Sequence, residues 1–141
     1  MPLVRNLSVW GKAHALAVAT YRASSGTPSR NFPALVGQLQ RASSAIAVNL
    51  SEGAASEAAE GFASYLAAAI SSTREVEYLL LLASDLGAIS KSNHAKLEAR
   101  TDQVTRMLAG LRATVRRRTL TPRAPIKRVK PPKSTVVSRS E

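Results

Sequence analysis

The sequence predicts an all-α protein, an antiparallel up-down-up-down four-helix bundle followed by a disordered basic C-terminal tail. Apolar residues recur at alternating spacings of three and four in four successive segments, which is the pattern of helices that each bury one face. Short stretches containing glycine, proline or serine separate the segments, so the stripes are buried most simply in an antiparallel bundle. We place the bundle at residues 1–115 and the tail at residues 116–141.

The first helix is predicted to start at Ser8, an N-cap residue type, and to end in the breaker cluster at residues 24–28. Its expected core face consists of Trp10, Ala13, Ala17 and Tyr21. The second helix is predicted to begin between Asn31 and Pro33, because proline lacks an N–H that the first turn would leave unpaired anyway. Its expected core face consists of Leu35, Leu39, Ala42, Ile46, Asn49 or Leu50, and Gly53.

The third helix is predicted to have Ser56 as its N-cap, with Glu57 and Glu60 near the positive end of the helix dipole, and to stop at Gly87. Its expected core face consists of Phe62, Leu66, Ala69, Thr73, Val76, Leu80 and Ala83. The fourth helix should follow Ser90, and its heptad-like core face consists of Leu97, Thr101, Val104, Leu108, Leu111 and Val115.

The third helix carries more apolar surface than one buried stripe can contain. Residues 78–82 are five consecutive large apolar residues, and at about 100° per residue they surround the helix. Either both neighbouring helices cover them or a second subunit does, and we favour the subunit interface. The expected oligomer interface consists of Tyr78, Leu79, Leu81 and Leu82.

The net charge of +11 is concentrated at the C-terminal end. Residues 1–112 hold 11 Lys or Arg against 8 Asp or Glu, whereas residues 113–141 hold 9 against 1. Frequent proline and high charge predict that the tail is disordered when free. The tail's expected nucleic-acid-binding residues are Arg116, Arg117, Arg118, Arg123, Lys127, Arg128, Lys130 and Lys133. Repeated in every subunit, they would attract phosphate backbones by counterion release, without aromatic platforms for base stacking.

No motif for catalysis, metal binding or cofactor binding is present. The chain has no cysteine, and its two histidines, His14 and His94, lie on different predicted helices without a metal-ligand spacing. Glu52, Glu75 and Glu77 have no partner for acid and base chemistry in a recognisable motif. We therefore expect a non-enzymatic, soluble, cytoplasmic protein with no cofactor and no membrane span.

Several polar residues instead suggest a structural network. Arg41, Asn49, Glu52 and Glu75 are its expected members, because Asn49 falls on an apolar helix face where an unpaired amide is unfavourable. Single replacement of Asn49 or Glu52 should then destabilise the protein by about 1 to 3 kcal/mol. The basic residues of the fourth helix do not share one stripe, so a solvated surface is their simplest interpretation.

Three stretches together resemble the four-helix-bundle family of 23S ribosomal RNA intervening sequence proteins. They are Val9–His14, Gln38–Ala42 continuing to Ile46–Gly53, and Glu75–Leu80 ending at Asp85–Gly87. An Asn-x-x-Glu-Gly element followed by a Glu-x-Glu-Tyr element is the most specific part of this resemblance, which covers roughly residues 4–112. The sequence departs from the family pattern at residues 54–60, which are small and acidic rather than basic.

The family is in turn similar to the accessory protein of diversity-generating retroelements, a barrel-shaped homopentamer that binds nucleic acid and a reverse transcriptase. The resemblance implies a ring-like homopentamer, which would cover the second face of the third helix. We expect a homo-oligomeric nucleic-acid-binding accessory protein that acts on RNA or RNA–DNA intermediates, with a reverse transcriptase as its implied protein partner. The alternative is a protein-interaction scaffold with no direct nucleic-acid role.

Overall fold

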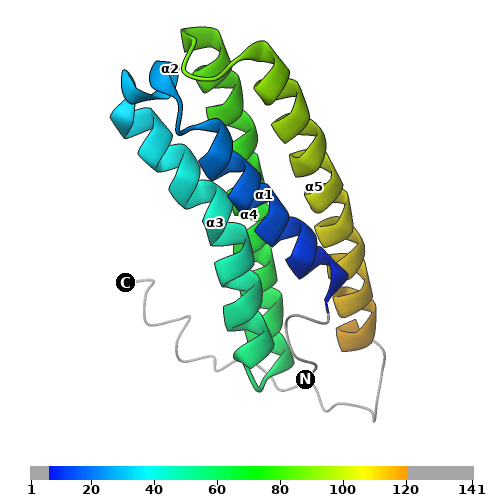
Figure 1. Cartoon of the computed structure of the whole chain (residues 1–141). Helices are drawn as coiled ribbons and strands as arrows, with labels where there is room; N and C mark the ends of the chain where they lie inside the picture. Colours follow the sequence, from blue (N-terminus) through cyan, green and yellow to red (C-terminus); the bar gives the residue numbers. More distant parts are fainter. Residues whose placement is uncertain (1–6, 121–141) are drawn as a thin grey trace, which may run out of the picture.

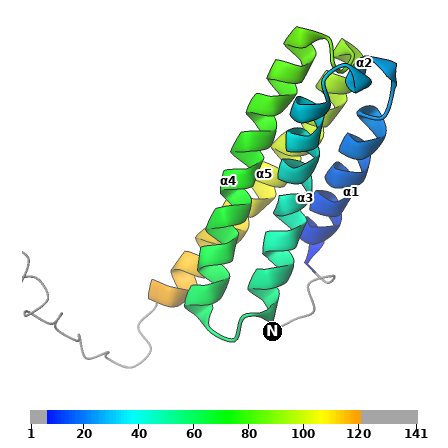
Figure 2. The ribbon, with the colours of Figure 1, turned by 90° about the vertical axis from the view of Figure 1, so that its left-hand side faces the viewer.

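Four long helices and one short helix make up residues 7–120, the part of the chain that the computed structural model describes (Figure 1). They are α1 (Ser8–Ala23), α2 (Thr27–Arg30), α3 (Pro33–Ala55), α4 (Ala59–Leu86) and α5 (Lys91–Leu120). The long helices alternate in direction (Figures 1 and 2). Within the described range, α1 and α4 each lie next to both α3 and α5, while no Cα atoms of the diagonal pairs α1–α4 and α3–α5 come within 8 Å of each other. The predicted four-helix packing is therefore confirmed.

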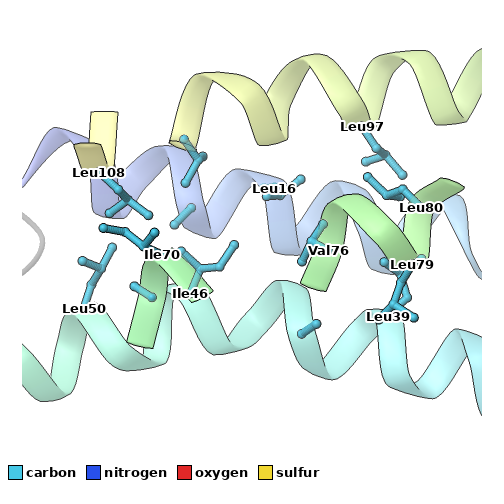
Figure 3. Packing of buried hydrophobic residues seen from close by; sticks show 14 of the residues in the cluster. Leu16, Leu39, Ile46, Leu50, Ile70, Val76, Leu79, Leu80, Leu97 and Leu108 are labelled. Carbon is cyan, nitrogen blue, oxygen red and sulfur yellow. The ribbon is translucent and has the colours of Figure 1, made fainter. Parts of the chain in front are cut away.

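Aliphatic side chains from all four long helices fill the space between them. Figure 3 shows Leu16 of α1, Ile46 of α3, Val76 of α4 and Leu108 of α5 pointing into this shared core, and each is fully buried. Most of the predicted core faces of α3, α4 and α5 are confirmed, with Leu50 rather than Asn49 in the core. The predicted core residues that are only partly buried are Leu35, Phe62, Leu111 and Val115.

The predicted core face of α1 is partly wrong. Tyr21 is 47% exposed and Trp10 is only partly buried, while Leu16 and Thr20 are completely buried. Tyr21 lies eight residues after the buried Ala13, and at about 100° per residue it is turned roughly 80° from the centre of the face. The buried face of α1 is therefore rotated away from Trp10 and Tyr21, the two aromatic residues that the prediction placed in the core.

Three predicted helix ends are confirmed. Pro33 opens α3, and Gly87 ends α4 in the left-handed region with φ +82°, where glycine has no Cβ to clash. Ser90 precedes α5, and its Oγ accepts a hydrogen bond from the backbone N–H of Asn93 at 3.0 Å. This is the geometry of an N-cap serine.

Two predicted N-caps are wrong. Ser8 is already inside α1, whose N-cap is Leu7, and α4 starts at Ala59, beyond the predicted cap Ser56. The Ser56 hydroxyl instead donates to the Ala58 carbonyl at 3.3 Å. These helices therefore begin without a side-chain cap, so tertiary packing rather than capping holds their first turns.

Helix α2 and the end of α5 differ from the sequence prediction. The four-residue α2 lies within the breaker-rich connection, and its Ser29 hydroxyl donates to the Ala88 carbonyl between α4 and α5 at 2.8 Å. Helix α5 extends past Val115, its last predicted core position, and continues through Arg116–Arg118 to Leu120. Arginine is a good helix former, and cations are favoured at a helix C-terminus.

Candidate nucleic-acid interface

The last turns of α5 carry the first three predicted nucleic-acid contacts, Arg116, Arg117 and Arg118. All three are exposed, and at about 100° per residue they point in different directions around the helix. The Arg117 guanidinium donates to the hydroxyl of Thr114 at 3.4 Å, one turn earlier. The helix therefore holds three cations around its end.

The other five predicted contacts lie outside the described residues. They are Arg123, Lys127, Arg128, Lys130 and Lys133.

The α4 apolar face, defined as Tyr78, Leu81 and Leu82, is incompletely covered within one chain. Tyr78 is 60% exposed and Leu81 is 47% exposed, while Leu82 is partly buried. Leu79 was predicted in the interface, but it is 4% exposed and belongs to the chain's own core. The reason is its position on the helix, next to the buried Leu80 and three residues after the buried Val76.

The members of the predicted polar network do not pair with one another within the described residues of one chain. The Asn49 side-chain amide donates to the Ala45 carbonyl of its own helix at 2.9 Å, which pairs it without any other helix. Arg41, Glu52 and Glu75 are exposed, and within residues 7–120 none of them makes a hydrogen bond or an ion pair. Arg41 and Asn49 are also eight residues apart, about 12 Å along α3.

The structure brings together three residues of the stretches that resemble the family, Trp10 and His14 on α1 and Ser51 on α3. The Trp10 indole N–H donates to the Ser51 hydroxyl at 3.1 Å and so links α1 to α3. The His14 ring stacks on Trp10, with centroids 5.2 Å apart and planes 7° from parallel. Both rings, Ser51 and Glu52 line a shallow groove of about 320 Å³. Sequence reasoning missed this cluster, although the Trp-x-x-x-His spacing places both rings on one side of a helix.

The described residues contain few elements of an active site. Glu52, Glu75 and Glu77 are exposed, and the single ion pair within residues 7–120 joins Lys91 and Asp85 at 4.0 Å. In that range no three His, Asp or Glu side chains cluster as metal ligands would. No helix of the described part is both long and apolar enough to cross a membrane.

Comparison with known families identifies the bundle. The profile of the family described as 23S rRNA-intervening sequence protein matches residues 5–110. The matched range includes all the stretches that carry the resemblance and ends before Arg116. No curated protein matches the sequence at a significant level.

Proposed function

This chain belongs to the 23S rRNA-intervening sequence protein family, and on that premise we propose that it is a non-enzymatic, homo-oligomeric nucleic-acid-binding accessory protein. RNA or an RNA–DNA intermediate is the proposed ligand, and a reverse transcriptase is a proposed protein partner. The proposed assembly is a ring-like homopentamer, in accordance with the resemblance to the retroelement accessory protein.

The cationic end of α5 is the observation that carries the nucleic-acid proposal. Arg116, Arg117 and Arg118 are exposed there, and the sequence continues with five more of the predicted basic contacts up to Lys133. Cations that neutralise phosphates release condensed counterions, which favours binding irrespective of base sequence. Copies of this segment in one oligomer would bind a single strand together, and the effective concentration of each copy would strengthen the binding.

The α4 apolar face favours self-association. Tyr78 and Leu81 are large apolar side chains that the chain leaves exposed on a helix whose opposite side is in the core. Covering them with a second copy would remove this surface from water.

A salt titration of full-length protein and short single-stranded RNA tests the proposal. Each phosphate contact contributes a slope of about −0.7 in log affinity against log salt on a single strand. Replacing Arg116, Arg117 and Arg118 together with glutamine should therefore flatten the slope by up to about 2 units. The exposed Arg30→Gln on α2 is the control, with the slope of the parent expected. Thermal unfolding and oligomer mass should change little in either variant.

If the triple variant binds RNA with the affinity and salt slope of the parent, the proposal that the tail contacts nucleic acid is wrong. The alternative function, a protein-interaction scaffold, would then be favoured. In that case the exposed Tyr78 and Leu81 would serve a partner protein, and the tail would tune solubility or bind an acidic surface.

A further inference from the structure

Helices α1 and α5 lie side by side (Figure 1). A groove runs along their contact. Its main part has a volume of about 510 Å³ and is lined by Arg22 from α1 and by Asn93 and Arg100 from α5. A second hollow of about 420 Å³ adjoins it at Arg100 on the surface of α5 and is lined by α5 residues alone, Lys96, Ala99, Arg100 and Gln103. We call the two together the α1–α5 groove. Its polar lining thus consists of three cations and two amides.

The lining of the α1–α5 groove contains no carboxylate. The chain has no Asp or Glu before Glu52, so α1 contributes none. On α5, Glu98 and Asp102 are each two residues from Arg100, which places them about 160° around the helix, on its other side. The lining of the groove therefore carries the positive charges of Arg22, Lys96 and Arg100 and no negative charge.

The three cations of the groove are also unpaired. Arg22, Lys96 and Arg100 are exposed, and within residues 7–120 none of them makes an ion pair or a hydrogen bond. Lys96 and Arg100 are four residues apart on α5, a like-charge spacing that weakly destabilises a helix. No group of the described chain neutralises these cations, so all three are free to contact an anionic ligand.

The rest of the lining suits a narrow polyanionic chain. On α1 it is apolar and small, formed by Ala15, Val18, Ala19 and Ala23, so a ligand backbone can approach the helices closely. No aromatic side chain lines the groove, which gives it no platform for base stacking. Such a groove would follow phosphates and not read bases.

We infer that the α1–α5 groove binds the sugar–phosphate backbone of a single-stranded nucleic acid. Arg22, Lys96 and Arg100 contact phosphates, and the amides of Asn93 and Gln103 donate further hydrogen bonds. The inference rests on the proposed function and assigns a contact to the folded bundle in addition to the tail. Arg118 lies 18 residues after Arg100, five helical turns or about 27 Å further along the same side of α5. A strand held at the end of α5 can therefore continue into the groove.

Two variants of the full chain test the groove, measured by fluorescence anisotropy with short mixed-sequence single-stranded RNA. Arg22→Gln combined with Arg100→Gln removes two phosphate contacts, so the salt slope should fall by about 1.4 and affinity at about 0.1 M salt should fall about 25-fold. Arg22→Lys combined with Arg100→Lys keeps both charges and should keep the slope. Arg106→Gln, on α5 but outside the groove lining, controls for the loss of net charge and should change affinity much less.

The outcomes separate the groove from the tail. If the parent binds RNA and the double glutamine variant loses no more affinity than Arg106→Gln, the groove inference is wrong and the tail proposal stands. If the parent binds no RNA, both are wrong. Circular dichroism should show parent-like helicity in every variant, because Arg22 and Arg100 are exposed and unpaired. A groove contribution is supported when the glutamine pair flattens the slope and the lysine pair restores it.

Discussion

Removing the α4 apolar face should dissociate the proposed oligomer without unfolding the chain. The perturbation is Tyr78→Gln combined with Leu81→Gln, because glutamine keeps helix propensity and similar length. Both side chains are largely exposed in the single chain, at 60% and 47%, so their replacement should have little effect on the core.

The exposed fractions give the size of the expected effect. Complete burial of a leucine contributes about 1.5 to 3 kcal/mol, so covering the exposed half of Leu81 contributes about 1 kcal/mol. The exposed 60% of Tyr78 corresponds to at least about 90 Å², or about 2 kcal/mol at 25 cal/mol per Å². Together these are about 3 kcal/mol for each interface, which is roughly a 100-fold increase in its dissociation constant.

Light scattering of a dilution series around micromolar concentration measures this effect. The parent should have an oligomer's mass, and the glutamine variant should approach the monomer's mass at concentrations where the parent remains assembled. Tyr78→Phe combined with Leu81→Met keeps the apolar surface and should retain the parent's mass. A monomeric parent, or a glutamine variant that assembles like the parent, would refute the assignment of this face to self-association.

Two further predictions concern the stability of the fold, measured by chemical denaturation. A Cβ at Gly53 would lie 3.0 Å from Phe62 Cδ1 and 3.1 Å from Tyr65 Cβ, so Gly53→Ala should destabilise the protein by about 1 to 3 kcal/mol. Gly110→Ala is its control, because no side chain or neighbouring helix lies within 4 Å of that Cβ, and it should stabilise the helix by up to about 1 kcal/mol. Glu52→Gln should change the free energy of unfolding by less than about 0.5 kcal/mol, since Glu52 is exposed. A loss of about 1 kcal/mol or more would instead support the predicted polar network.

The sequence alone predicted most of the buried face of each helix in which apolar residues recur at a regular spacing. The faces of α3, α4 and α5 were predicted because a buried stripe every 3.6 residues is a local property of the chain. Pro33 and Gly87 marked helix ends for equally local reasons, a missing N–H and a tolerated positive φ. The sequence also predicted that one stripe could not bury all of residues 78–82, and Tyr78 and Leu81 are indeed left exposed.

What needed the tertiary structure was the pairing of side chains on different helices. Within one chain Asn49 bonds to the backbone of its own helix and not to Glu52, because an amide on a helix can donate to a carbonyl one turn earlier. Polarity alone therefore does not identify its partner. Arg22 and Arg100 lie far apart in the sequence, and only the antiparallel packing of α1 against α5 places them in one groove. Helical periodicity fixes which side of a helix a residue occupies, whereas the neighbour on that side depends on how all four helices pack around their shared core.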